Sequence, residues 1–144
     1  MKLNLDCVRD ILLFLEKQNN VNLSEDGEIS WVPVRIEDLF EGLNKYNRRE
    51  VFYAVHNMEQ AGLLDCSTEY ADDSLDYCFI NYITFEGHEF LEGVRGNKRW
   101  ASVKKVAEKV GVFSFQVLAS IAQSMAKAGI NAVLSGYNLP VIGD

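Results

Sequence analysis

Hydrophobic residues recur at helical spacing near the start of the chain. Asn4 is suited to cap a helix, and the apolar residues after it fall on one face: Leu5, Val8, Ile11, Leu12 and Leu15. Further along, the segment EDLFEGL has the pattern of a short helix that buries Leu39, Phe40 and Leu43. Both segments are therefore expected to be helical.

The most clearly marked helix follows Asn47. Asn47 and Glu50 have the spacing of a capping box, with Asn in place of the usual Ser or Thr. The residues after them make one apolar face, formed by Val51, Ala54, Val55, Met58 and Ala61. Gly62 is suited to end the helix in the left-handed conformation. The pattern predicts a helix over residues 47–61.

Between and after these helices the pattern favours extended chain. Residues 19–30 are polar, and we expect a loop there, whereas WVPVRI favours a strand that Pro33 confines to a sheet edge. The β-prone runs LLDCSTEY and DYCFINYITF, joined by ADDS, predict a hairpin with its tip near Asp72–Asp73. In a register centred on that turn, Cys66 and Cys78 project from opposite faces.

The remainder of the chain is again helical in pattern. Thr84 can cap the segment FEGHEFLEGV, and Asn97 can cap a helix with one apolar face, formed by Trp100, Val103, Ala107 and Val110. Ser114 can cap a last helix that continues through Ala128 and ends at Gly129.

The predicted order of helix, short strand, helix, helix and hairpin is that of a winged helix-turn-helix. We therefore expect a mainly α (α+β) fold: a winged-helix body over residues 1–95, with a small β-hairpin wing, and a helical C-terminal extension over residues 96–144. In this interpretation residues 47–61 form the recognition helix and residues 71–76 form the tip of the wing.

Three segments resemble one known family. MKLNLDCVRDILLFLE, the third-helix segment ending in AGLL, and YITFEGHEFLEGVRGNKRW are similar to the domain-of-unknown-function family 2513, a group of small proteins of bacteria and their prophages. The resemblance covers roughly residues 1–110, and YITFEGHEFLE is its most specific part. It supports the fold and a bacterial or prophage origin, and it implies no catalytic or binding residues.

Charge divides the chain unevenly. The net charge is −7, but residues 1–94 hold seven basic and 19 acidic residues, whereas residues 95–144 hold seven basic and two acidic residues. The basic segment is expected to dock on the acidic body or to meet an acidic partner. No CxxC pair occurs among the three cysteines, and no segment has the length of a membrane span, so we expect a cytoplasmic protein without a zinc module or cofactor.

One face of the third helix carries candidate binding chemistry. Arg49, Tyr53, His56 and Gln60 form a stripe opposite the apolar face, and Lys45 and Arg48 lie near the helix start. These side chains can contact base edges or phosphates. A solvated helix face is the simpler explanation of the stripe, and a protein-binding face is a further alternative. The acidic residues of the predicted wing disfavour DNA: Glu69, Asp72, Asp73 and Asp76.

The C-terminal segment is nearly uncharged. Between Val112 and Gly143 the single charged residue is Lys127. We expect an apolar stripe there to be covered by a second copy of the chain, giving a homodimer, or by the chain's own core; its members are Phe115, Leu118, Ile121 and Met125. Binding to a membrane surface is not expected, since the segment lacks a basic polar face.

No catalytic motif emerges from the sequence. His56 and His88 are the two histidines, and the sequence contains no nucleophile elbow, phosphate-binding glycine loop or HExxH pattern. The sequence therefore favours a non-enzymatic binding module that contacts nucleic acid, such as DNA, or a regulatory or acidic protein. The alternative is an interaction or oligomerisation domain that has lost DNA binding.

Overall fold

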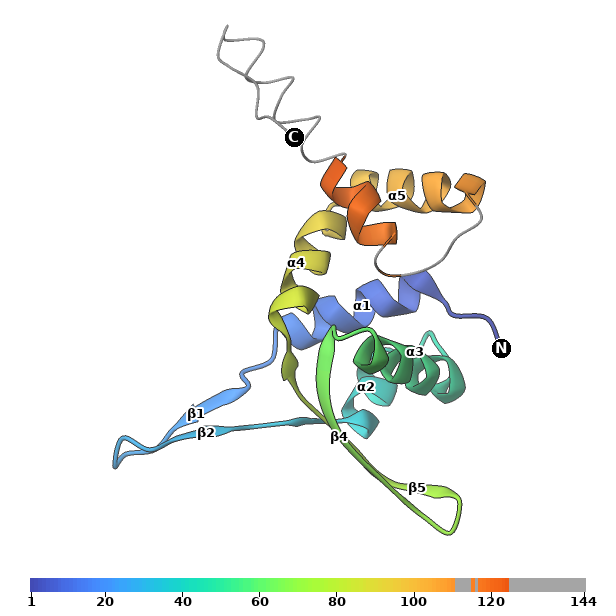
Figure 1. The fold of residues 1–144 in the computed structure, drawn as a ribbon. Coiled ribbons are helices and arrows are strands. Elements are labelled where there is room, and N and C mark those ends of the chain that lie inside the picture. Colours follow the sequence, from blue (N-terminus) through green and yellow to red (C-terminus); the bar gives the residue numbers. More distant parts are fainter. Residues whose placement is uncertain (111–114, 116, 125–144) are drawn as a thin grey trace, which may run out of the picture. The chain divides into compact units, whose positions relative to one another are not determined.

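A computed structural model describes residues 1–110, 115 and 117–124 of the chain. The chain has a mixed α+β fold and divides into two compact units, Met1–Leu91 and Glu92–Asp144. Figure 1 traces the elements in chain order from blue to red. Because the candidate binding residues of the third helix belong to the first unit, that unit is described first.

The helices of the first unit begin where their capping residues predict. The Asn4 side chain accepts a hydrogen bond from the backbone N–H of Cys7 at the start of α1 (Leu5–Glu16), and Asn47 accepts from Glu50 at the start of α3 (Arg48–Gln60). The short α2 (Ile36–Gly42) lies between them in the chain. Gly62 follows α3 with a φ of 81°. These predicted helices are therefore confirmed.

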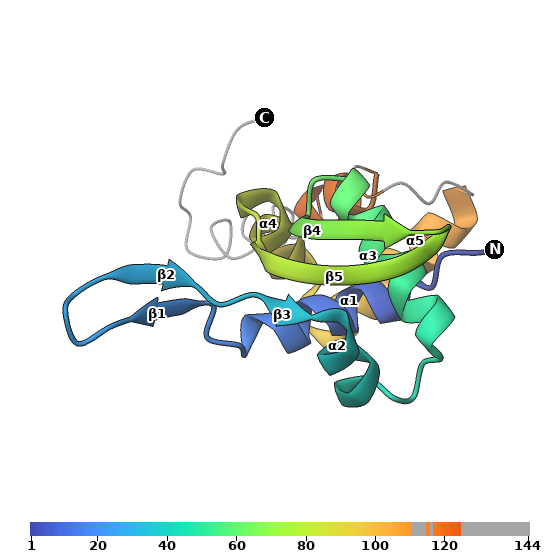
Figure 2. The ribbon, with the colours of Figure 1, turned by 90° about the horizontal axis from the view of Figure 1, so that it is seen from below.

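A three-stranded antiparallel sheet completes the core of this unit. Its strands β3 (Val34–Arg35), β4 (Leu64–Ala71) and β5 (Ser74–Ile83) have the order β3–β5–β4, so the strand after Pro33 lies at an edge, as predicted. Asp72 and Asp73 form the tip of the β4–β5 hairpin, both with positive φ. Figure 2 shows β3, β5 and β4 side by side.

Two irregularities change the predicted register of this hairpin. Register shifts fall between Asp65 and Cys66 and between Glu69 and Tyr70. As a result Cys66 pairs with Ile80, and Thr68 pairs with Cys78. Since alternate residues of a strand share a face, both cysteines lie on the same face, and the prediction of opposite faces is wrong.

The segment expected to be a polar loop contains a second, separate hairpin. β1 (Val21–Leu23) pairs antiparallel with β2 (Ile29–Trp31) around a turn in which Gly27 has a φ of 85°. We call these two strands the β1–β2 ribbon. In both views it extends away from the helices of the first unit (Figures 1 and 2). The loop prediction for residues 19–30 is therefore wrong.

The core of the first unit joins the helices to one face of the sheet. Its fully buried large side chains include residues of α1, α2, α3 and β5: Val8, Ile11, Leu12, Leu15, Ile36, Leu39, Val51, Val55, Met58 and Ile80. Phe40 and Leu43, which were expected to be buried with Leu39, are only half-buried. Ala61, which was expected on the apolar face, is the C-cap residue of α3 and is exposed.

The later helices begin near the predicted positions. α4 (Phe85–Val94) is capped by the Thr84 hydroxyl, which accepts from the backbone N–H of Gly87 at 3.0 Å. In the second unit α5 (Asn97–Val110) buries Trp100, Val103 and Ala107. Residues 117–124 are helical, as is Phe115. The predicted end of this last helix, at Ala128–Gly129, lies outside the described residues.

Candidate nucleic-acid interface

The predicted binding stripe lies on the outer face of α3. Arg49, His56 and Gln60 are exposed, and Tyr53 is half-buried. The opposite face is buried, because Val51, Ala54, Val55 and Met58 recur at helical spacing and pack into the core. The structure therefore presents these side chains along one accessible surface of the helix.

The two cations nearest the start of α3 already contact other side chains. The Lys45 Nζ lies 2.9 Å from the Asp10 carboxylate of α1, and the hydrogen bond to Asp10 raises the pKa of Lys45. The Arg48 guanidinium lies 5.3 Å from the centre of the Phe40 ring, a cation–π arrangement. Asp10 offsets the charge of Lys45, whereas the ring contact leaves Arg48 charged and exposed.

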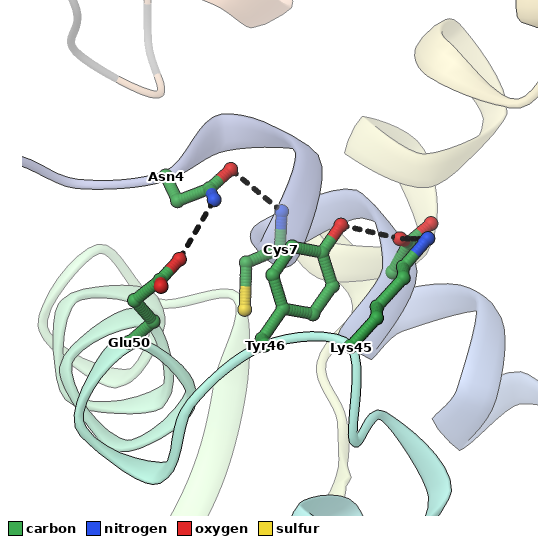
Figure 3. A network of polar contacts seen from close by, with 6 residues as sticks. Asn4, Cys7, Lys45, Tyr46 and Glu50 are labelled. Carbon is green, nitrogen blue, oxygen red and sulfur yellow. Dashed lines mark hydrogen bonds and ion pairs between the residues drawn. The ribbon is translucent and has the colours of Figure 1, made fainter.

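A polar cluster fixes the start of α3 against α1 (Figure 3). The Glu50 carboxylate accepts hydrogen bonds from the side-chain amides of Asn4 and Asn47, both at 2.9 Å. The Tyr46 hydroxyl donates to Asp10 at 2.6 Å. The Asn4–Glu50 and Tyr46–Asp10 contacts join residues far apart in the sequence, and they hold the turn between α2 and α3 against α1. The Glu50 carboxylate, near the N-terminal end of the predicted binding stripe, therefore accepts hydrogen bonds from within the protein.

The same cluster encloses a thiol that is poorly suited to nucleophilic chemistry. Cys7 has no exposed surface. Its burial, reinforced by the nearby carboxylates of Glu50 and Asp10, raises the pKa of the thiol to about 12. The thiol therefore stays protonated at neutral pH, whereas a reactive cysteine needs its thiolate. Burial likewise raises the pKa of the Cys66 and Cys78 thiols.

The β4–β5 hairpin keeps its acidic character. Its outer half exposes four carboxylates, those of Glu69, Asp72, Asp73 and Asp76. It also exposes three large apolar or aromatic side chains, those of Tyr70, Leu75 and Tyr77. A nucleic-acid backbone approaching this hairpin would meet negative charge, so the hairpin tip offers no phosphate contact.

The second unit presents its own basic surface. On α5 the exposed cations are Lys98, Arg99, Lys105 and Lys109, and the Lys104 ammonium lies 5.5 Å from the centre of the Trp100 ring. Of the predicted interface residues, Leu118 is fully buried in the single chain, whereas Phe115 and Ile121 are half-buried. Met125 lies outside the described residues.

Sequence reasoning missed the apolar surface of the β1–β2 ribbon. Val21 and Trp31 are paired, as are Leu23 and Ile29, so all four side chains share one face. At the base of the ribbon the Trp31 ring lies 4.7 Å from the Tyr82 ring, beside a hollow of about 380 Å³. The signal was present, because VNLSEDGEISW alternates apolar and polar residues around an Asp-Gly turn.

Two kinds of feature were sought in the part of the chain that the structure describes: clusters of metal-ligating side chains and membrane-spanning helices. Within residues 1–110, 115 and 117–124, no cluster of three or more His, Cys, Asp or Glu side chains could hold a metal ion. No helix among the same residues has both the length and the hydropathy needed to cross a membrane.

These observations define a small mixed α+β protein with an exposed helix face, an acidic hairpin and an apolar ribbon. The chain belongs to the family described as hypothetical protein DUF2513, whose family model matches residues 2–113, and this confirms the resemblance in the sequence. An uncharacterized protein of Haemophilus influenzae is 26% identical over 133 residues, which cover 87% of this chain and 95% of the relative. No solved structure matches the chain.

Proposed function

We propose that the first unit is a winged helix-turn-helix module that binds nucleic acid through the outer face of α3. The observation that carries this proposal is the exposure of Arg49, His56 and Gln60 on the second helix of a close helix pair. In helix-turn-helix proteins the second helix enters the major groove, and its first residues contact base edges. Arg48 and Arg49 occupy that end of α3.

The sheet gives the proposal a second support. β3 precedes α2, and it pairs with β5 of the hairpin that follows α3. The sheet therefore packs against both helices of the pair. The order of the elements along the chain and the order of the strands in the sheet are those of a winged helix in which the β4–β5 hairpin is the wing. The β1–β2 ribbon is then an insertion between α1 and the first strand of that fold.

The acidity of the unit restricts the kind of contact. Counterion release by Lys and Arg supplies much of the affinity for duplex DNA, and the α3 end carries Arg48, Arg49 and the Asp10-paired Lys45. We therefore expect few phosphate contacts, weak binding to duplex DNA, and a salt dependence whose log–log slope is small, about one unit per phosphate contact. Readout by Arg49, His56 and Gln60 then contributes mainly to sequence preference.

Fluorescence anisotropy with labelled duplex DNA tests the proposal at roughly 50 and 200 mM salt, because the logarithm of the affinity falls linearly with the logarithm of the salt concentration in proportion to the number of phosphate contacts. Replacing Arg48 and Arg49 together with Ala should weaken binding and flatten its salt dependence by about one unit of log–log slope per lost phosphate contact. The control is Lys105→Ala with Lys109→Ala, which removes two exposed cations from α5.

The control also separates the outcomes. If the α5 variant loses binding and the α3 variant retains it, the contact lies on α5 and the proposal for α3 is wrong. If the parent protein binds no duplex at low salt, the module contacts a protein instead. The exposed carboxylates of Glu69, Asp72 and Asp76 favour that second candidate, because they suit a partner with a basic surface.

A further inference from the structure

β4 forms a free edge of the three-stranded sheet. The strand order is β3–β5–β4, so β4 pairs with β5 along one side only (Figure 2). Among the residues that the structure describes, no backbone hydrogen bond other than those of the β4–β5 pairing reaches residues 64–71. Alternate residues of an antiparallel strand direct their N–H and C=O groups away from the neighbouring strand, so β4 presents a row of these groups along its other side.

This edge lacks the features that usually protect an edge strand. Natural edge strands are short, are bent by bulges or carry Pro and Lys, because an unprotected edge pairs with other chains. β4 extends over eight residues, Leu64–Ala71, and contains neither Pro nor Lys. Both irregularities of the hairpin leave a residue of β5 unpaired, Asn81 or Asp76, whereas every residue of β4 has a partner. β4 is therefore a regular, uninterrupted template for one more strand.

The two faces of the β4 edge offer different chemistry to an added strand. Leu64 is buried on the core side of the sheet, opposite buried Ile83. By alternation the core side also carries Cys66, Thr68 and Tyr70, and the outer side carries Asp65, Ser67 and Glu69. Cys66 and Thr68 are half-buried, whereas Ser67 and Glu69 are exposed. An added strand would therefore contact a partly buried surface with one set of its side chains and a polar, acidic surface with the other.

The hairpin carries negative charge without a cation to offset it. No Lys or Arg occurs between Arg49 and Arg95 in the sequence. The hairpin and its turn contain five carboxylates: Asp65, Glu69, Asp72, Asp73 and Asp76. Asp65 accepts hydrogen bonds from Asn81 and Tyr82, at 2.8 and 3.3 Å. The exposed Glu69 side chain forms no hydrogen bond or ion pair with any described residue, so its charge is available to a neighbouring strand.

We propose that the β4 edge binds an extended segment of a partner protein in which Lys or Arg alternates with apolar residues. The segment adds to β4 as a fourth strand, so that backbone hydrogen bonds supply affinity and alternate side chains supply specificity. Its cations lie on the outer side beside Asp65 and Glu69, where cross-strand neighbours of opposite charge stabilise the pairing. Its apolar side chains lie on the core side beside Thr68 and Tyr70.

Charge disfavours two other occupants of the edge. A second copy joined edge to edge would bring two acidic hairpins together, and neither hairpin has a Lys or Arg to offset the repulsion. A nucleic-acid backbone would meet the same negative charge. The inference uses neither α3 nor its cations, so it is independent of the nucleic-acid binding proposed for that helix.

An eight-residue peptide in which Lys alternates with Val, equal in length to β4, provides the test. One control peptide has the same composition arranged as a block of Lys followed by a block of Val, and a second has Glu in place of Lys. Fluorescence anisotropy of the labelled peptides should show saturable binding of the alternating basic peptide alone. On binding, amide exchange should slow at the β4 residues whose N–H groups point to the open edge and stay unchanged in the β1–β2 ribbon.

Matched charge variants of the protein locate the contact. Glu69→Lys should weaken binding of the alternating peptide roughly fivefold at about 150 mM salt, because a cross-strand attraction becomes a repulsion. Asp26→Lys makes the same change of net charge in the turn of the β1–β2 ribbon and should alter the affinity by less than about twofold. Arg48→Ala with Arg49→Ala should bind the peptide as the parent does, whatever its effect on DNA. Circular dichroism checks that each variant is folded.

Several outcomes would overturn the proposal. They are failure of the alternating peptide to bind at up to about 1 mM, equal binding of the block peptide, and unchanged amide exchange in β4. Equal losses for Glu69→Lys and Asp26→Lys would show that net charge alone attracts the peptide. Sedimentation velocity of the parent without peptide completes the test, because a dimer with protected β4 amides would make a second copy the occupant of the edge.

Discussion

Thr84 connects three backbone segments by itself. Its hydroxyl accepts from the N–H of Gly87 at the start of α4 and donates to the carbonyl of Gly62 after α3. Its own N–H donates to the Leu63 carbonyl at 3.1 Å. Gly87 sits so close to that carbonyl that a Cβ atom there would collide with it. The Thr and Gly of the TFEG sequence are thus explained by packing, in the segment that most specifically resembles the family.

Substitution of Thr84 separates the role of its hydroxyl from that of its shape. Thr84→Val keeps the side-chain volume but removes the helix cap and the bond to Gly62, so we expect a loss of about 1–2 kcal/mol in the free energy of unfolding. Thr84→Ser keeps the hydroxyl and should remain within about 0.5 kcal/mol of the parent. Urea unfolding followed by circular dichroism measures both, and equal losses would contradict the role of the hydroxyl.

At the scale of elements, the residues at the tip of the β4–β5 hairpin are not the ones that would stabilise its turn most. Asp72 and Asp73 have φ values of 52° and 62°, so both central residues of the turn are left-handed. Two-residue hairpin turns of this kind favour Asn-Gly or Asp-Gly.

Asp73→Gly should therefore stabilise the protein by up to about 1 kcal/mol, because glycine adopts the left-handed conformation without steric cost. The comparison variant is Ala71→Gly, in the paired part of β4, which should destabilise the protein by roughly 0.5–1 kcal/mol. Thermal unfolding of the two variants measures the difference. A fall in melting temperature for Asp73→Gly would show that the turn is not under this strain.

The elements differ in how far the sequence alone could predict them. Helical spacing and capping residues located α1, α3 and α4, because both signals are local. The β1–β2 ribbon was missed because the polar residues of its turn and outer face obscured the alternation of Val21, Leu23, Ile29 and Trp31. The register of β4 and β5 depends on an extra residue at each bulge, which a regular alternation pattern does not reveal.

The candidate site was likewise predicted only in part: features set by one helix were predicted, and contacts between elements were not. The stripe of Arg49, His56 and Gln60 follows from the period of one helix, and it is exposed as that period implies. The pairing of Lys45 with Asp10 links residues from different elements, so it depends on how α1 packs against the turn before α3. Local periodicity contains no such information.

At the scale of the whole molecule, three buried or half-buried thiols and a half-buried tyrosine hydroxyl influence stability in alkaline solution. The pKa of Cys7 rises from 9.0 to about 12 on folding, so the unfolded chain loses this proton first as the pH increases. Between pH 9 and 12 the native state binds more protons than the unfolded state, and the stability falls by up to about 1.4 kcal/mol per pH unit from this group. Cys66, Cys78 and Tyr46 act in the same direction.

Cys7→Ala should consequently flatten the decline of stability above pH 9, although it lowers stability at neutral pH by leaving a small cavity. Urea unfolding at several pH values between about 7 and 11 gives the two slopes for comparison. Parallel slopes for parent and variant would mean that Cys7 ionises equally easily in the folded and unfolded states.

The anchoring at Thr84 also determines how motion is distributed along the β4–β5 hairpin. Leu64 pairs with Ile83 immediately beside the Thr84–Leu63 hydrogen bond, whereas Ala71 and Ser74 pair at the exposed far end. The hairpin is therefore fixed at the end near Thr84 and opens from its tip. Among the β4 amide protons that are hydrogen-bonded to β5, exchange with solvent should become progressively slower from residue 71 back to residue 64. A partner bound at the tip would therefore bend the outer part of the hairpin, while the end of α3 and the start of α4, which Thr84 joins, keep their positions.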